Sequence, residues 1–303
     1  MRLIVHIGYN KTGTSSIQSY CFEHAEALRR DGLCYSTIGT HDNAHYVVSK
    51  LFIGAPSSEA VNTPPDLMER FREDFERSGC ESLLLSSEYL VLANHIHIQA
   101  IRDALYKYFQ VDECKIVVYL RRHDLWFESL FNQAVKNVDS PPWELDIKDY
   151  VIQSLGGAGN RPHYFTVLEH WAKEFGKDAM IVRPFETAQF VGGSLISDFF
   201  AHAFPQHKAG FETSDIRTNV SVSPNKLYMI GLLRRWPKSP ERDTAINKML
   251  NAPDTSETAF PADFGVLTKK QRRGIVRFFE PEYARIAKKY LKRSNGKLFM
   301  EEV

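Results

Sequence analysis

The sequence has few features that point to disulfide bonds, structural zinc or nucleic-acid binding. Its four cysteines, Cys21, Cys34, Cys80 and Cys114, are far apart and form no C-x-x-C pair, which argues against a zinc site and a disulfide framework. Lysine and arginine together number 38, and aspartate and glutamate 37, so no excess charge favours nucleic acid as a partner. Scattered thiols are typical of the reducing cytosol. We therefore expect a cytoplasmic protein.

Long hydrophobic runs are also missing. No stretch approaches the roughly 18 apolar residues that cross a bilayer, and the apolar segment at residues 3–7 is too short for a signal peptide. The sequence shows no internal repeat and no low-complexity tract. We therefore expect a soluble chain that begins with its first structural element and has no stable membrane insertion.

The apolar residues that are present suffice for a large core and follow an alternating pattern. Of the 303 residues, 43% are apolar and 25% charged, as in ordinary globular domains. Strand-like apolar segments occur at residues 3–7, 33–36, 82–86, 115–120 and 179–183. Helical spacing of apolar residues occurs at 17–28, 67–75, 98–109, 125–134, 165–175 and 194–203. This alternation predicts an α/β fold in which helices cover both faces of a parallel sheet.

We expect one domain, residues 1–303, with a core of about 1–136 plus 163–204. Segments 41–65, 139–162 and 205–261 contain stretches richer in proline, glycine and polar residues, and we interpret them as loops and lids rather than linkers. Residues 267–291 predict a basic amphipathic helix that Pro281 kinks or divides.

The segment IGYNKTGTSS, residues 7–16, resembles a phosphate-binding loop with a displaced lysine. Gly8 and Gly13 have the G-x-x-x-x-G spacing, but Thr14 and Ser15 follow where a triphosphate loop has Lys and Ser or Thr. A strand that turns through glycines into a helix presents unpaired N–H groups to an anion. Lys11 lies inside this loop. Its ammonium would lie over the loop mouth, where it could meet a bridging oxygen that gains charge as a bond breaks.

A second motif follows the strand at 115–120. In VVYLRRHDLWFESLFNQ, residues 117–133, Arg121 comes just past the strand and Ser129 follows eight residues later on the next predicted helix. Together with the loop, this element resembles the sulfotransferases that use 3′-phosphoadenosine-5′-phosphosulfate (PAPS), in particular their bacterial and glycan-type members. The resemblance implies a P-loop NTPase-like parallel sheet flanked by helices, in agreement with the alternation above. It also implies a nucleotide-binding core, with the lid segments binding the acceptor.

The resemblance also assigns residues to the two ends of the nucleotide. It implies that the 5′-phosphosulfate is bound by Asn10, Lys11, Thr12, Gly13, Thr14 and Ser15. Arg121 and Ser129 would bind the 3′-phosphate, with Arg122 displaced by one residue from the family spacing. Arg217 and Asn219, in RTNVSVS at 217–223, would close over the nucleotide, although a helix start at Ser223-Pro224 explains part of this pattern equally well.

The displaced lysine agrees with sulfuryl transfer. A transferring sulfuryl group carries less negative charge than a phosphoryl group, so it does not need the Mg²⁺ bridge of phosphoryl transfer. What remains is positioning and stabilisation of the leaving phosphate. Ser86-Ser87-Glu88 stands after the strand at 82–86, where a metal-binding aspartate would be expected. We therefore expect no metal, and 3′-phosphoadenosine-5′-phosphate as the product.

An acceptor hydroxyl must lose its proton, so a base is expected near the transferred group. Glu88 follows a core strand at the carboxyl edge of the sheet, where ligands bind in such folds. It could instead cap the next helix or pair with an arginine. His45 and His41, in GTHDNAHYVV, are the competing bases.

The sequence therefore predicts an enzyme that moves a sulfuryl group from PAPS to a hydroxyl or amine, with a carbohydrate as the expected acceptor. One alternative is a P-loop kinase for a small molecule, against which the missing lysine after Gly13 counts. Another is a non-catalytic nucleotide-binding module. The presence of both Lys11 and Glu88 counts against it.

Overall fold

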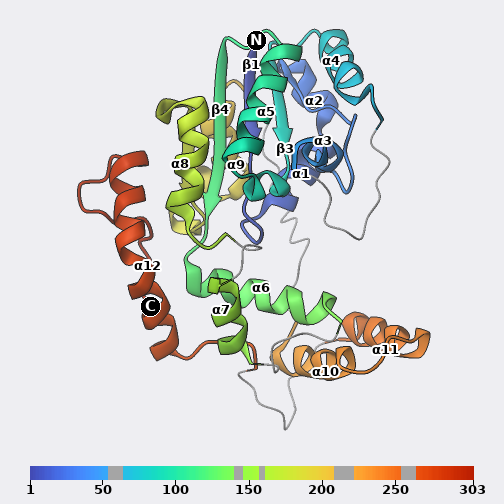
Figure 1. Cartoon of the computed structure of the whole chain (residues 1–303), viewed down its shortest axis with the longest axis vertical. Helices are drawn as coiled ribbons and strands as arrows, with labels where there is room; N and C mark the ends of the chain where they lie inside the picture. Colours follow the sequence, from blue (N-terminus) through green and yellow to red (C-terminus); the bar gives the residue numbers. More distant parts are fainter. Residues whose placement is uncertain (54–63, 140–145, 157–160, 208–221, 254–263) are drawn as a thin grey trace. The chain divides into compact units, whose positions relative to one another are not determined.

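The sheet lies at the centre of the fold. The computed structural model describes residues 1–53, 64–139, 146–156, 161–207, 222–253 and 264–303 (Figure 1). Five parallel strands have the order β2-β3-β1-β4-β5. They are β1 (Arg2–His6), β2 (Leu33–Cys34), β3 (Ser82–Ser86), β4 (Glu113–Leu120) and β5 (Met180–Pro184). The predicted α/β class with a parallel sheet is confirmed. Because β1 is central, the loop after it opens at the carboxyl edge where ligands bind in open α/β sheets.

One face of the sheet packs against α1 (Thr14–Glu23) and α9 (Leu195–Ala203). Ile4 of β1 pairs with Leu84 of β3, and both are fully buried in one core cluster with Phe199 of α9. Paired residues of parallel strands share a face, because side chains alternate along each strand. This cluster therefore fixes the start of α1 against the end of β1.

The other face is covered by α5 (His95–Tyr108) and α8 (Tyr164–Phe175), which pack against each other in front of the strands in Figure 1. Their buried residues, such as Ile98, Leu105 and Trp171, recur at helical spacing. Both faces are thus covered, which explains why the strand segments are almost continuously apolar.

Most predicted boundaries agree with the structure to within a few residues. The helix α4 (Leu67–Ser78) ends at Gly79, which has φ 67° and supplies the left-handed C-terminal residue. The predicted single helix over residues 17–28 is instead two, α1 and α2 (Ala25–Arg30), separated at His24. The backbone N–H of His24 still bonds to the Tyr20 carbonyl at 3.0 Å, but its φ of −108° departs from helical geometry.

The remaining helices show that the predicted lid segments are not simply loops. The described parts of 41–65, 139–162 and 205–261 contain α3 (Tyr46–Ile53), α7 (Ile147–Gly156), α10 (Pro224–Arg234) and α11 (Pro240–Asn251). The structure also has α6 (His123–Asn137), α12 (Lys269–Tyr290), and the short 3₁₀ helices η1 (Glu88–Leu92), η2 (Lys177–Ala179), η3 (Thr187–Gln189) and η4 (Val191–Gly193). Ser223 and Ser239 both cap helices that begin with proline, so the helix start considered at Ser223-Pro224 is present, whereas the equivalent Ser239-Pro240 was missed.

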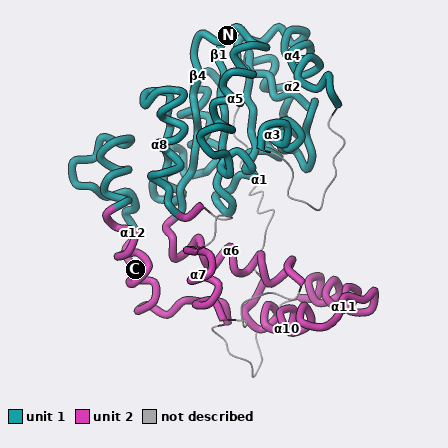
Figure 2. Tube along the Cα trace, viewed as in Figure 1, with its two compact units in different colours: residues 1–121, 163–218, 282–301 teal, residues 122–162, 219–281, 302–303 magenta. Residues whose placement is uncertain are grey.

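The residues divide into two compact units (Figure 2). Unit 1, which contains the sheet, comprises Met1–Arg121, His163–Thr218 and Glu282–Glu301, and unit 2 comprises Arg122–Pro162, Asn219–Pro281 and Glu302–Val303. Each unit is assembled from several chain segments, so neither is a separate stretch of sequence, and the single domain stays a prediction. Pro281 does not interrupt α12, although the unit boundary falls there. No helix in the described ranges combines the length and apolarity needed to cross a bilayer.

Candidate active site

The loop between β1 and α1 has a backbone that only certain residues tolerate. Gly8, Lys11 and Gly13 have φ values of 36°, 67° and 76°. A Cβ on Gly13 would lie 2.2 Å from Leu195 Cδ2, so both the conformation and the space require glycine there. Gly13 also caps α1 without a side-chain hydrogen bond. The start of α1 therefore has the N–H groups and dipole that bind anions.

The predicted hydroxyl groups of the loop divide into two roles. Thr12 and Thr14 are buried, and their Oγ1 atoms donate to the Tyr9 carbonyl at 2.7 and 3.1 Å. These hydroxyls hold the loop in shape. Asn10 and Ser15 are exposed, so their side chains are accessible to a ligand.

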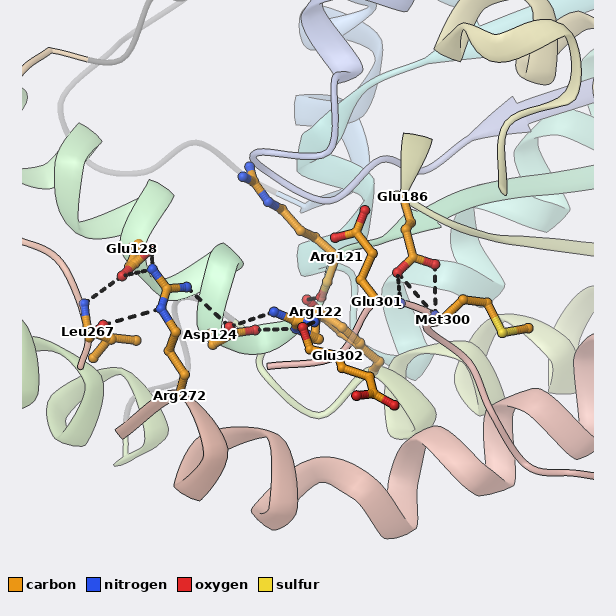
Figure 3. A network of polar contacts seen from close by, with 11 residues as sticks. Arg121, Arg122, Asp124, Glu128, Glu186, Leu267, Arg272, Met300, Glu301 and Glu302 are labelled. Carbon is orange, nitrogen blue, oxygen red and sulfur yellow. Dashed lines mark hydrogen bonds and ion pairs between the residues drawn. The ribbon is translucent and has the colours of Figure 1, made fainter. Parts of the chain in front are cut away.

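Arg121 connects the end of β4 to the loop. One guanidinium nitrogen donates to the Lys11 carbonyl at 3.1 Å, and the Tyr164 hydroxyl donates to the Arg121 carbonyl at 2.9 Å. Figure 3 shows the Arg121 side chain extending toward the pale blue N-terminal loop. The charge of Arg121 therefore lies at the loop that carries Lys11.

Three other residues were assigned to the nucleotide, namely Ser129, Arg217 and Asn219. Ser129 lies half-buried on α6, which belongs to unit 2, so its pairing with Arg121 stays a prediction. Arg217 and Asn219 lie outside the described residues. Their predicted role in closing over the nucleotide also stays a prediction.

Arg122 has a structural role in unit 2. Its guanidinium donates twice to Asp124, at 2.8 and 3.0 Å, and Arg272 of α12 bonds both Asp124 and Glu128 of α6 (Figure 3). Arg122 and Asp124 are both buried. This buried ion pair stabilises the start of α6. The guanidinium of Arg122 is therefore already bonded to Asp124.

Glu88 is positioned by a helix start and by a buried glutamine. Ser87 caps η1 by accepting from the Tyr89 N–H at 3.4 Å, so the cap role considered for Glu88 belongs to Ser87. Gln18 of α1 is 2% exposed, and its Nε2 donates to Glu88 Oε2 and to Ser86 Oγ, both at 3.2 Å. Glu88 is thus held in place by a buried amide that donates to one of its carboxylate oxygens.

His45 does not fit the role of base. Its Nδ1 accepts from the Ser86 N–H at 3.1 Å, and its Nε2 lies 2.9 Å from the Ser36 carbonyl and donates to it. Burial lowers the pKa of His45 to about 4, although its two backbone hydrogen bonds oppose this shift. Both nitrogens are occupied in the core between β2 and β3. The structure therefore argues against the predicted catalytic role of His45.

A pocket of about 240 Å³ lies beside the start of α1 in unit 1. Its lining residues come from α1, from the loop after β2, from α3 and from η1, and they are Ser15, Gln18, His41, Asp42, Ala44, Tyr46, Glu88 and Tyr89. The structure thus brings Glu88, Ser15 and His41 together and leaves His45 in the core. The contributions of Gln18, Tyr46 and Tyr89 had no sequence motif. In the described ranges, no three His, Cys, Asp or Glu side chains gather as metal ligands would.

Comparisons with known proteins add a limited context. No family model matches the chain. An uncharacterized protein of Archaeoglobus fulgidus is 32% identical over 117 residues, which are 39% of this chain and 28% of that protein. This chain therefore matches little more than a quarter of that protein's length. A solved sulfotransferase from Alicyclobacillus acidocaldarius is 14% identical with a TM-score of 0.44, covering 94% of this chain and 93% of its own.

Proposed function

We propose that this protein is a sulfotransferase that moves a sulfuryl group from PAPS to a hydroxyl or amine of a carbohydrate. The observation that carries the proposal is the position of Lys11. It lies within the loop that turns β1 into α1, with φ 67° and with Arg121 bonded to its carbonyl. A lysine in this place supports stabilisation of charge on a leaving phosphate rather than the grip on outer phosphates that a triphosphate loop provides.

On the donor side, the N-terminus of α1 and the ammonium of Lys11 would bind the 5′-phosphosulfate. The exposed Asn10 and Ser15 are available to the same group. The family resemblance assigns the 3′-phosphate to Arg121 and Ser129, and an arginine at the carboxyl edge of the sheet suits such a phosphate because its charged N–H groups match phosphate oxygens.

On the acceptor side, Glu88 would act as the general base. Its carboxylate would take the proton of the acceptor hydroxyl while the hydroxyl oxygen attacks the sulfur atom. The bond between sulfur and the phosphate oxygen would break, and Lys11 would stabilise the charge on 3′-phosphoadenosine-5′-phosphate as it leaves. The pocket that contains Glu88 and Ser15 supports this arrangement, because it joins the candidate base to the first turn of α1. His41 also lines this pocket and is the second candidate.

We also propose that the reaction takes place in the cytoplasm. All four cysteines are free, and Cys21, Cys34 and Cys114 are buried. Burial raises the pKa of the Cys34 thiol to about 11 and that of Cys114 to about 12. Unreactive buried thiols of this kind agree with a reducing compartment.

Calorimetric titration with PAPS, its desulfated product, adenosine 5′-phosphosulfate and ATP tests the proposal. We expect the first two to bind more tightly than ATP, and Arg121→Ala to weaken PAPS by roughly 1.5–3 kcal/mol. Adenosine 5′-phosphosulfate lacks the 3′-phosphate and serves as the matched control, so its affinity should hardly change. Preference for ATP would favour a kinase. Binding of PAPS without sulfate transfer to any sugar, lipid or phenol would favour a non-catalytic module.

A further inference from the structure

The rim of the pocket is built by a tight turn with a defined conformation. His41 and Ala44 form an antiparallel bridge, with N–H to carbonyl distances of 2.8 and 3.0 Å. Asp42 and Asn43 between them have φ values of 49° and 67°. Positive φ at both central residues is the combination of a type I′ hairpin turn, which Asp and Asn tolerate well. The turn therefore sets where Asp42 lies.

This turn is anchored to its surroundings on both sides. The Tyr35 hydroxyl donates to the Asn43 carbonyl at 2.6 Å, and Asn43 Nδ2 donates to Ser19 Oγ of α1 at 3.3 Å. Tyr35 is 1% exposed. Because the turn is tied to the core and to α1, the backbone of Asp42 is held at the rim of the pocket, while its side chain is 93% exposed.

The permanent charges that line this pocket are negative, and His41, whose Nδ1 lies 3.4 Å from Asp42 Oδ2, adds a positive charge only when it is protonated. Asp42 and Glu88 are its two acids, and no lysine or arginine is among the described residues that line it. Lys50 is not one of the lining residues. It is 7% exposed, and its Nζ lies 4.1 Å from the ring centroid of Tyr46, which is one of them. A carboxylate or phosphate on the acceptor ring would therefore approach two like charges, Glu88 in the wall and Asp42 at the exposed rim, which is unfavourable.

The remaining walls suit a small ring that carries hydroxyl groups. Tyr46 and Tyr89 form one wall with their ring centroids 4.3 Å apart, and Gln18 and Glu88 offer hydrogen-bonding groups. Binding pockets for drug-sized ligands usually occupy about 300–1,000 Å³, and this one of about 240 Å³ is smaller. Aromatic walls with a few polar groups bind ligands that have both apolar faces and hydroxyls.

We propose that this pocket binds a single sugar ring of the acceptor, that the ring is uncharged or carries an amine, and that Asp42 is a specificity-determining residue that disfavours carboxylated and phosphorylated rings. The inference rests on the proposed function, because it identifies the pocket beside Glu88 as the acceptor site. It adds the charge class of the acceptor, which the sequence motifs do not define.

Three matched sugars test the proposal: glucose, glucosamine and glucuronate, which are neutral, cationic and anionic. Their dissociation constants would be measured by ligand-observed NMR on the full chain, with and without saturating 3′-phosphoadenosine-5′-phosphate, so that no turnover interferes. We expect glucosamine to bind at least about fivefold more tightly than glucuronate, with glucose between them. Asp42→Asn tolerates the same backbone and should reduce that ratio roughly two- to fivefold, the usual effect of an exposed charge pair.

Asp178→Asn, which removes an exposed acid remote from the pocket lining, should leave the ratio unchanged. Equal affinity for glucosamine and glucuronate would overturn the proposal, as would an unchanged ratio in Asp42→Asn or the absence of binding by all three sugars. Failure of the proposed function is a separate result, namely a chain that binds ATP in preference to PAPS. If the chain binds ATP in preference to PAPS, the sugar affinities measured without nucleotide still test the pocket.

Discussion

Lys11 and Glu88 owe their proposed roles to backbone positions that other side chains hold in place. The hydroxyls of Thr12 and Thr14 close the loop around Lys11 through the Tyr9 carbonyl. Gln18 holds Glu88 through one oxygen at 3.2 Å. At the scale of single residues, the supporting side chains of Thr12, Thr14 and Gln18 are buried, whereas the proposed reacting residues Lys11 and Glu88 are half-buried.

Lys11→Ala should lower kcat for sulfate transfer by on the order of 10² or more, because its ammonium would act mainly on charge that develops in the transition state. The affinity for PAPS should change much less. Turnover of labelled PAPS and calorimetric binding measure the two effects. A variant with nearly normal turnover would show that Lys11 is an ordinary loop residue without a catalytic role.

Glu88→Gln should lower turnover by about 10²–10⁴, since the amide keeps the size and most hydrogen bonds of the side chain but cannot accept a proton. PAPS affinity should stay intact. His45→Ala, measured in parallel, should lose stability instead, because it leaves the Ser86 N–H and the Ser36 carbonyl without their partner. If only the histidine variant lost turnover at unchanged stability, the base would be assigned to the wrong residue.

At the scale of elements, the junction between β1 and α1 depends on its packing against α9. Leu195 and Phe185 occupy the space next to Gly13, at 2.2 and 3.0 Å from where its Cβ would lie. The loop thus has no room for a side chain at the start of α1. Its geometry is set by the helix on the same face of the sheet and not by the loop sequence alone.

Gly13→Ala should therefore destabilise the protein by about 2–4 kcal/mol, the sum of left-handed backbone strain and overpacking. Gly79→Ala is the matched control, because Gly79 has φ 67° but no atom within 4 Å of the added Cβ. Gly79→Ala should lower the free energy of unfolding only by the backbone strain, about 1–2 kcal/mol. Urea unfolding compares the two. Equal losses of stability in the two variants would mean that Leu195 of α9 moves aside for the added Cβ and does not constrain the loop.

At the scale of the whole molecule, two fully buried histidines couple the fold to pH. Burial lowers the pKa of His6 to about 3 and that of His45 to about 4. Both are neutral in the folded state, whereas in the unfolded chain a histidine titrates near 6.5. The unfolded chain therefore binds more protons as the pH falls below about 6.5, and the free energy of unfolding decreases over that range.

Stability should be largely independent of these groups above pH 6.5 and should fall by about 2 kcal/mol per histidine between pH 6.5 and 5. Urea unfolding at pH 7.5, 6 and 5 measures this slope. His45→Gln should be less stable at pH 7.5 but should show a shallower slope, whereas the exposed His95→Gln should keep the wild-type slope. A stability that is equal at pH 7.5 and 5 would contradict the expectation.

Local patterns predicted much of the fold, and their failures have a common cause. The strand over 82–86 and the helix end at Gly79 agree with the structure, because apolar continuity and left-handed glycine are local signals. The helices α3, α7, α10 and α11 lie in segments that were interpreted as loops or lids from their proline and polar residues, although a helix start at Ser223-Pro224 was considered. In α10 and α11, however, the proline occupies the first helical position, where it is favoured.

The sequence by itself determined the parallel α/β fold and the loop with its internal lysine, because strand alternation and glycine spacing act between neighbours in the chain. It left three candidate bases open, and only the tertiary structure sets the buried His45 apart from Glu88 and His41, which both line the pocket. The contacts that do so join residues far apart in the sequence, 70 positions between Gln18 and Glu88 and 41 between His45 and Ser86. Accessibility of a carboxylate and burial of an imidazole depend on how distant segments pack, which no local pattern records.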